Sequence, residues 1–206
     1  KKSGGGFADV AGMETLKAEL TKRVIWVLKD KEKAQKYRLT PPNGMILYGP
    51  PGCGKTTLLR DLVRQISDGS GEFPGREVGV VDERSEIAAC RNGITKHNIG
   101  RFSCVMDAVP KGEGISMLLR TMSPEIIVTD ETGTPEEEAA ICEMINCGVK
   151  IITTAHGYSD RDVRKRKYLG SLIENGIFER IIVLGNSKGI ATVEKIISDG
   201  RVIRRA

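Results

Sequence analysis

A glycine-rich octapeptide, GPPGCGKT at residues 49–56, constrains the fold of this chain more than any other feature. It matches the pattern GxxxxGK[ST] at every fixed position and lies between the apolar run Met45–Tyr48 and the helix-forming segment Lys55–Ile66. In such a place the glycines let backbone N–H groups turn inward around phosphate groups, and the positive end of the helix dipole faces the same anion. The octapeptide therefore predicts a P-loop, the phosphate-binding loop of nucleotide-binding α/β proteins.

Each part of this loop has an expected contact with ATP and Mg²⁺. Lys55 is expected to reach the β- and γ-phosphates, and the Thr56 hydroxyl is expected to ligate Mg²⁺. A turn that merely links a strand to a helix is the alternative, and it leaves the lysine and the threonine unexplained. The candidate nucleotide-binding residues of this stretch are Gly49, Pro50, Pro51, Gly52, Cys53, Gly54, Lys55, Thr56 and Thr57, and Lys55 is also a candidate catalytic residue.

Around the loop, short apolar runs alternate with longer segments of helical periodicity. We expect strands over residues 45–48, 78–82, 126–130 and 149–154, and helices over residues 55–66, 114–122 and 135–146. Such alternation predicts a three-layer α/β sandwich with a mostly parallel sheet, in which the P-loop strand lies beside the strand that ends in Asp130. Residues 180–184 and 191–197 flank a glycine-containing turn and predict a C-terminal hairpin.

The length and composition of the chain agree with a soluble globular protein. Its 206 residues are 39% hydrophobic and 29% charged, which is enough for a sizeable core. No apolar run approaches the roughly 20 residues that cross a bilayer, and no signal-peptide pattern opens the chain. We expect a flexible leader over residues 1–6, a helical flank over 7–44 and the P-loop core over 45–206, in a cytoplasmic protein that is either free or peripheral at a membrane complex.

A P-loop ATPase needs a second carboxylate that holds Mg²⁺ at the end of a buried strand. The apolar run that ends in Asp130 and Glu131 supplies it, with Asp130 in the metal shell and Glu131 placed to polarise the attacking water. An acid directly after the metal aspartate is typical of the glutamate-using (ASCE) class of P-loop ATPases. Two acids that only cap a strand are the alternative.

Two further strands end in polar residues that we assign to the same site. Glu83 follows the strand over residues 78–82 and is a second candidate for the catalytic base, although we prefer Glu131 because it follows the metal aspartate directly. Arg84 is either a salt-bridging surface arginine or a phosphate contact. The strand over residues 149–154 leads to Thr154 and His156, either of which is a candidate sensor of the γ-phosphate.

Residues from Thr57 to about Gly200 resemble the stage III sporulation protein AA family, which is similar to the ATPases of type II and type IV secretion. The resemblance lies in TTLLRDLVRQIS, VGVVDERSEIAAC, VMDAVPKGEGISMLLRTMSPEIIVTDE, GVKIITTAHG and IFERIIVLG. The resemblance implies that the chain is an ATPase that powers an oligomeric machine. It also implies that the ATPase forms a hexamer and that its partners are membrane-embedded sporulation channel proteins. It also implies an acidic box at Asp82-Glu83, a Walker B pair at Asp130-Glu131 and a histidine box at His156.

Phe7 to about Thr56 instead resembles the start of a classical AAA-type ATPase module. The segments that carry this resemblance are FADVAGMETLKAELTKRV and PPNGMILYGPPGCGKT. It implies that Val10, Ala11 and Gly12 contact the adenine of the nucleotide. Because the two resemblances meet inside the P-loop, the sequence predicts a fusion of two P-loop proteins, either natural or engineered.

The sequence leaves two alternatives to simple ATP hydrolysis open. In one, nucleotide binding only orders a subunit interface, so that the chain is a switched assembly module. In the other, the basic run over residues 161–167 belongs to a translocase that nucleic acid stimulates, although our main interpretation does not require nucleic acid. We also expect an arginine from a neighbouring subunit to contact the developing charge, and Arg101, Arg120, Arg161 and Arg164 are the unranked candidates.

The N-terminal flank generates the first testable prediction. Its apolar stripe, which includes Leu16, Leu20 and Val24, is expected to pack on the P-loop core, because a stripe of that length in water favours aggregation. Deleting Lys1–Leu39 should therefore lower the melting temperature and weaken ATP binding relative to the full chain. An unchanged melting temperature and affinity would show that the segment is a loosely tethered leader.

Overall fold

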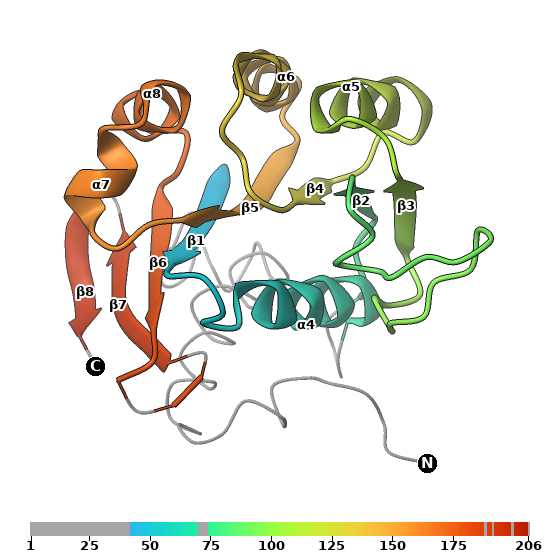
Figure 1. Cartoon of the computed structure of the whole chain (residues 1–206). Helices are drawn as coiled ribbons and strands as arrows, with labels where there is room; N and C mark the ends of the chain where they lie inside the picture. The colour runs from blue at the N-terminus through green and yellow to red at the C-terminus, as the bar shows by residue number, and fades with distance from the viewer. Residues whose placement is uncertain (1–41, 70–73, 188, 191, 199, 206) are drawn as a thin grey trace.

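The computed structural model describes residues 42–69, 74–187, 189–190, 192–198 and 200–205 (Figure 1). Residues 7–41 of the predicted N-terminal flank, with the expected adenine contacts, lie outside the described residues, and the last residue of that flank, Gly44, begins β1. The strands are β1 (Gly44–Gly49), β2 (Val78–Asp82), β3 (Ser103–Asp107), β4 (Ile126–Thr129), β5 (Lys150–His156), β6 (Arg180–Gly185), β7 (Thr192–Ser198) and β8 (Arg201–Arg205). The helices are α4 (Lys55–Asp68), α5 (Lys111–Thr121), α6 (Pro135–Asn146), α7 (Asp160–Arg164) and α8 (Lys167–Glu174).

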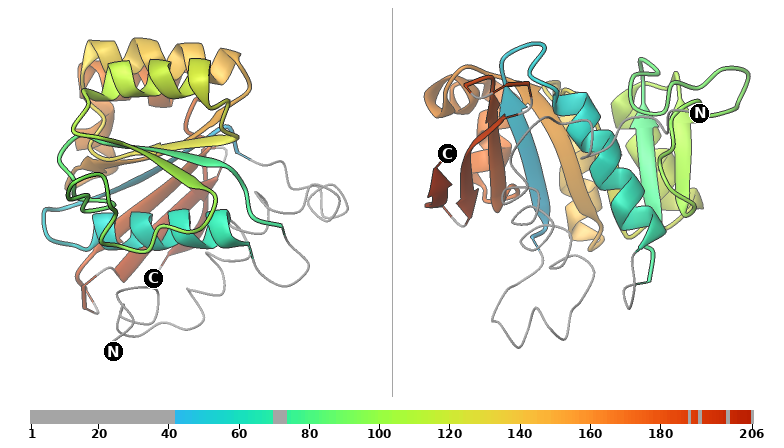
Figure 2. Two further views of the ribbon diagram at one scale, coloured as in Figure 1. Left: turned by 90° about the vertical axis from the view of Figure 1, so that its right-hand side faces the viewer. Right: turned by 90° about the horizontal axis from the view of Figure 1, so that it is seen from below.

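All of these strands belong to one sheet, in the order β3-β2-β4-β5-β1-β6-β7-β8. The first six strands of that order are parallel, and β7 and β8 continue the sheet in antiparallel fashion. Helix α4 covers one face of the sheet, while α5, α6 and α8 cover the other (Figures 1 and 2). Two clusters of buried apolar side chains fill the spaces between these layers. The three-layer α/β architecture that the alternation predicts is therefore confirmed.

The place of the P-loop strand in the sheet differs from the prediction. We expected β1 beside β4, but β5 lies between them and pairs in parallel with both strands. Strand β5 is buried along its centre, from Ile151 to Ala155, as a strand covered on both faces by helices must be. A strand with that burial pattern requires a hydrogen-bonded neighbour on each side, and β1 and β4 are those neighbours.

Helix α5 begins earlier than its sequence pattern suggests. The prediction placed its start at Gly114, whereas the helix begins at Lys111 directly after Pro110. Glycines in the first turn obscure the helical pattern, but at least one of them is needed for packing: a Cβ atom on Gly114 would lie 2.6 Å from Cγ1 of Val81. The close contact between α5 and β2 therefore requires a residue without a side chain.

Four elements of the fold, β3, α7, α8 and β8, were not predicted as separate elements. The strand β3 is the edge of the sheet and is only half-buried throughout, so it shows no clear apolar alternation. The strand β8 ends the sheet at the other edge, and the basic run over residues 161–167 extends from α7 to the first residue of α8. The predicted hairpin is confirmed as β6 and β7, which pair in antiparallel fashion with a register shift between Val183 and Leu184.

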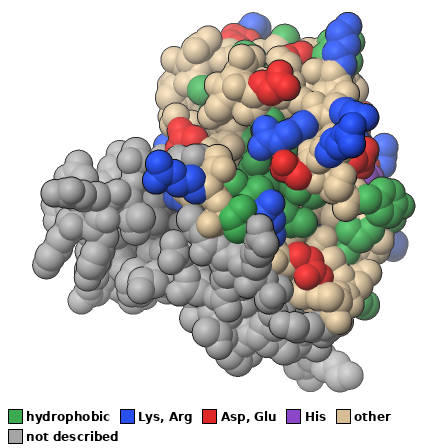
Figure 3. All heavy atoms as spheres, turned by 90° about the vertical axis from the view of Figure 1, so that its left-hand side faces the viewer, with side chains coloured by type: hydrophobic (Ala, Val, Ile, Leu, Met, Phe, Trp, Pro, Cys, Tyr) green, Lys and Arg blue, Asp and Glu red, His purple; other side chains and the backbone are tan. Residues whose placement is uncertain are grey.

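The face of the molecule near β8 and α7 carries mixed charges. Figure 3 shows Lys and Arg side chains interspersed with Asp and Glu side chains on this face. Within α7, Arg164 pairs with Asp160, and Arg166 just after the helix lies 3.8 Å from Asp162. Part of the basic run is therefore neutralised by acids one helical turn away. Among the described helices, none combines the length and the hydropathy that a membrane crossing requires.

The N-terminus of α6 generates a prediction about stability. The Thr134 side chain accepts a hydrogen bond from the Glu137 backbone N–H, and the Glu137 carboxylate accepts one from the Thr134 backbone N–H, which together form a capping box. Thr134→Ala should lower the free energy of unfolding by about 1 kcal/mol and the melting temperature by roughly 2–4 °C, measured by thermal denaturation. Thr121→Ala is the matched control, because its hydroxyl only donates to the Met117 carbonyl within α5.

Candidate active site

The parallel strands all point in the same direction, so their C-terminal ends lie side by side. The P-loop joins β1 to α4 at these ends. The loop takes left-handed backbone conformations at Gly52 (φ 72°) and Gly54 (φ 83°), where L-residues with side chains are strained. A Cβ atom on Gly49 would lie 2.4 Å from the Leu184 carbonyl oxygen, so the loop also passes too close to β6 for any other residue. Each fixed glycine of the motif therefore has a structural reason.

Lys55 is buried within the loop and is anchored at its amino group. Its Nζ donates hydrogen bonds to the carbonyl oxygens of Gly49 at 3.0 Å and Pro50 at 2.9 Å. The same Nζ lies 3.2 Å from Nδ1 of His156, at the end of β5. Cys53 packs beneath it with a buried side chain, and burial raises the pKa of the Cys53 thiol above its ordinary value. Cys53 is therefore a packing residue of the loop.

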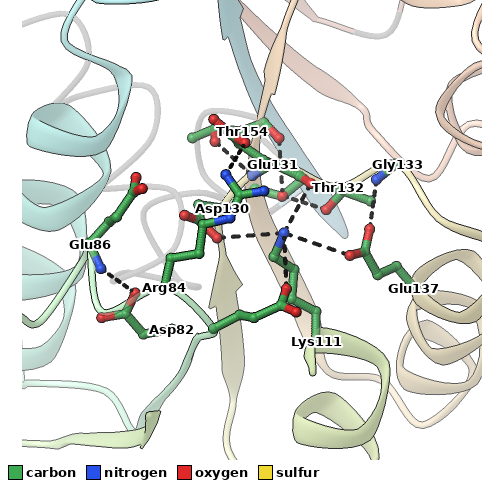
Figure 4. Close-up of polar contacts among 12 residues, drawn as sticks. Asp82, Arg84, Glu86, Lys111, Asp130, Glu131, Thr132, Gly133, Glu137 and Thr154 are labelled. Carbon is green, nitrogen blue, oxygen red and sulfur yellow. Dashed lines mark hydrogen bonds and ion pairs between the residues drawn. The ribbon is translucent and has the colours of Figure 1, made fainter. Parts of the chain in front are cut away.

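His156 connects the P-loop lysine to the predicted catalytic base. Its Nε2 lies 2.5 Å from Oε1 of Glu131, while its Nδ1 faces Lys55. The other carboxylate oxygen of Glu131 accepts from Arg84 at 3.1 Å (Figure 4). These four side chains, which come from the ends of β2, β4, β5 and the start of α4, form one continuous polar chain. Of the two readings of Arg84, the salt bridge is the one observed, and its partner is Glu131.

The backbone of Glu131 is strained and is held on both sides. Its φ is 41°, in the left-handed region that residues other than glycine rarely adopt. Its N–H donates to the Thr154 hydroxyl at 3.0 Å, and its carbonyl accepts from Nζ of Lys111 at 3.1 Å. Of the two sensor candidates, Thr154 therefore binds the backbone of Glu131, whereas His156 contacts its carboxylate and the P-loop lysine.

Lys111 is the residue of this site that the sequence analysis missed. It is the first residue of α5, and only 4% of its side chain is exposed. Its Nζ lies 3.6 Å from Glu83, 3.7 Å from Asp130 and 3.6 Å from Glu137, so it makes ion pairs with three carboxylates (Figure 4). The signal in the sequence was a lysine just after a strand, but that strand, β3, was itself not predicted.

Asp130 has the environment expected of a metal-binding carboxylate. It is buried, and neither carboxylate oxygen has a hydrogen-bond partner among the described residues. Burial raises the pKa of its carboxyl above the ordinary value, and the nearby Lys111 acts in the opposite direction. Buried oxygens without donors suit a hard divalent cation, which is usually held by one or two protein groups together with substrate phosphates. The environment of Asp130 therefore fits Mg²⁺, which Asp130 and the half-buried Thr56 would hold.

The two acids at the end of β2 have different environments. Asp82 is fully buried and accepts hydrogen bonds from the backbone N–H groups of Glu86, Ile87 and Ala88, so it shapes the loop that follows β2. Glu83 is 41% exposed at its side chain and reaches the site through its ion pair with Lys111. Only Glu83 of this pair therefore points to the cluster around Asp130.

The candidate arginines separate into two groups, according to which ends of the parallel strands they lie near. Arg101 precedes β3 and Arg120 lies in the last turn of α5, so both lie near the N-terminal ends of the parallel strands, away from the P-loop. Arg161 and Arg164 lie on α7, which follows β5 at the C-terminal ends of the parallel strands, where the P-loop also lies. The Gly157 N–H after β5 donates to the Gly49 carbonyl at 3.2 Å, which joins this segment directly to the loop.

The chain is similar to known proteins over most of its length. The sequence model of the family described as "Sporulation stage III, protein AA" matches residues 21–204. The chain is 45% identical over 161 residues to "Stage III sporulation protein AA" of Bacillus subtilis (strain 168), a match that covers 78% of this chain and 52% of that protein. The chain thus spans about half the length of this relative.

A second set of relatives matches a shorter part of the chain. Over 57 residues, which are 28% of this chain and 8% of the relative, it is 44% identical to "ATPase family protein 2 homolog" of Caenorhabditis elegans. Among solved structures, that of the ATPase DotB from Legionella pneumophila superposes with a TM-score of 0.57 at 16% identity, covering 88% of this chain and 46% of that one. This likeness shows that the two proteins share the P-loop fold.

The position of Lys55 generates a prediction about nucleotide binding. Because its ammonium is the side-chain cation that the P-loop fixes, Lys55→Ala should weaken the binding of ATP with Mg²⁺ more than tenfold, which is at least ~1.4 kcal/mol. The measurement is a titration with a fluorescent ATP analogue, accompanied by a melting curve to show that the fold is intact. Lys165→Ala, an exposed lysine beyond α7, is the control. An affinity within about threefold of the parent chain would contradict the phosphate-site assignment.

Proposed function

The chain belongs to the sporulation stage III, protein AA family, and we propose that it binds ATP with Mg²⁺ and hydrolyses it to ADP and phosphate. The observation that carries this proposal is the contact of His156 with both Lys55 and Glu131, at 3.2 and 2.5 Å. A purely structural glycine-rich turn would not need a base, a lysine and a histidine in one polar chain at its mouth. The proposal therefore rests on the arrangement of side chains as well as on the sequence motif.

In this proposal the loop and the start of α4 bind the phosphates. Backbone N–H groups of the loop and the helix dipole attract the negative charge, and Lys55 exchanges its contacts with the carbonyls of Gly49 and Pro50 for phosphate oxygens. Thr56 and Asp130 would hold Mg²⁺, which supplies positive charge for the β- and γ-phosphate oxygens. Catalysis is then mainly the placement of charge around the transferred phosphoryl group.

Glu131 is the proposed general base. Its carboxylate lies in the polar chain that leads to Lys55, so a water between it and the γ-phosphate is within reach of both. His156 and Arg84 bind the two oxygens of this carboxylate and orient it. Glu83 is the other candidate for the base. Its side chain is 41% exposed and pairs with Lys111, so we assign it an auxiliary role in the site and not that of the base.

His156 is also the proposed sensor of hydrolysis. Its imidazole bridges the lysine that binds the γ-phosphate and the glutamate that activates water, so loss of the phosphate charge would change both of its contacts. Thr154 is less suited to this role, because its hydroxyl is bound to the backbone N–H of Glu131.

The wider role of the chain is proposed from its family. We infer a homo-oligomer, as a hexamer, in which an arginine from a neighbouring subunit completes the site, with Arg161 and Arg164 placed on the appropriate edge. Membrane-embedded sporulation channel proteins are the proposed partners of a cytoplasmic ATPase. The proposal does not involve nucleic acid, and two arginines of the basic run, Arg164 and Arg166, pair with acids of the same segment.

The assignment of the base generates a further prediction. Glu131→Gln preserves the shape of the side chain but removes its basicity, so the rate of phosphate release should fall by about 10²–10⁴-fold while ATP affinity changes less than about threefold. Phosphate release and binding of a fluorescent ATP analogue measure the two effects. Glu143→Gln, an exposed glutamate on α6, is the matched control.

Two results would redirect the proposal. If turnover survives in Glu131→Gln and disappears in Glu83→Gln, the base is Glu83. If the unaltered chain binds ATP but releases no phosphate, with or without added nucleic acid, the chain is the nucleotide-switched assembly module.

A further inference from the structure

The peptide group that links Glu131 to Thr132 is held from both sides. Its carbonyl accepts a hydrogen bond from Nζ of Lys111 at 3.1 Å, and its N–H donates to the Thr154 carbonyl at 3.1 Å. The preceding peptide group is held as well, because the Glu131 N–H donates to the Thr154 hydroxyl. A strained backbone of this kind persists only where its surroundings determine it fully.

We propose that Lys111 is a positioning residue for ATP hydrolysis: its ammonium fixes the strained backbone of Glu131 and so directs the carboxylate toward His156 and Lys55. This inference rests on the proposed function, because it assigns Lys111 a role through the proposed base. Lys111 itself pairs with Glu83, Asp130 and Glu137, and the proposal gives it no contact with the nucleotide.

The stability of α5 does not explain why a lysine stands at this position. Lys111 is the first residue of the helix, where the helix dipole is positive and a cation is unfavourable. A buried ammonium also loses hydration, which is tolerated only when anions or carbonyl groups replace the water. The three carboxylates and the Glu131 carbonyl supply that replacement, so the lysine belongs to the site and not to the helix.

The charge of the cluster agrees with the same role. Glu83, Asp130 and Glu137 approach one ammonium from β2, β4 and α6, and each lies 3.6–3.7 Å from it. By formal charge, three carboxylates around one ammonium make a net negative cluster, which can still attract a divalent cation to Asp130. Lys111 therefore links three elements to the backbone of the base without neutralising the proposed metal site.

The experiment compares two substitutions of Lys111 in the full chain. Lys111→Met keeps most of the length of the side chain but removes the charge and the donor, whereas Lys111→Gln keeps an N–H donor without the charge. Lys165→Met, at an exposed lysine, is the control. The readouts are kcat and KM for ATP hydrolysis, binding of a fluorescent ATP analogue, and hydrogen exchange of the backbone amides of residues 130–133.

In Lys111→Met we expect the backbone amide of Thr132 to exchange its hydrogen faster than in the parent and kcat to fall about 100-fold. The affinity for ATP should stay within about threefold of the parent. Lys111→Gln should recover part of both losses. The proposal would be overturned if Lys111→Met had the same amide exchange rate and the same kcat as the parent. It would also be overturned if both variants lost as much affinity for ATP as they lost in kcat. Faster exchange in Lys111→Met, in a chain whose parent hydrolyses no ATP, would support the positioning role and contradict the proposed function.

Discussion

The insertion of β5 between β1 and β4 is the constraint on which the geometry of the site depends. The parallel register places Gly49 beside His156 and Thr129 beside Thr153, so β1 and β5 end level, while β4 ends three residues earlier and its Asp130 and Glu131 follow toward the same end. Because neighbouring strands are about 4.8 Å apart, β1 and β4 lie about 10 Å apart across the sheet, with β5 between them. A lysine on one side and a glutamate on the other then meet most directly through a residue on β5, and His156 occupies that place with one ring nitrogen facing each.

The same strand contributes a second residue with a different task. Thr154 uses its hydroxyl and its carbonyl to bind the two N–H groups of Glu131 and Thr132, whereas His156, two residues later, contacts side chains only. One strand end thus fixes the backbone of the proposed base and also contacts its carboxylate. This division explains why both polar residues of the strand end were candidates from sequence, and why they are not equivalent in the structure.

The features that the sequence predicts well are those that local backbone geometry determines. The P-loop, Asp130 and Glu131 follow directly from strands and turns whose residues are adjacent in the chain, and the fold class follows from the alternation of elements. The order of the strands does not, because it depends on pairings between segments about 100 residues apart, such as β1 with β5. Lys111 was missed for the same reason: its partners lie on β2, β4 and α6, and the strand before it is a half-buried edge strand without alternation.

The strain at Glu131 can be weighed against the contacts that hold it. A residue other than glycine in the left-handed region costs on the order of 1–3 kcal/mol. Hydrogen bonds to charged groups contribute about 1.5–3 kcal/mol each, and neutral ones about 0.5–1.5 kcal/mol. The Lys111 ammonium supplies one bond of the first kind, and Thr154 supplies two of the second. Together they are large enough to offset the strain, so a glutamate can occupy a left-handed backbone conformation that glycine adopts more readily, and from there its carboxylate contacts His156.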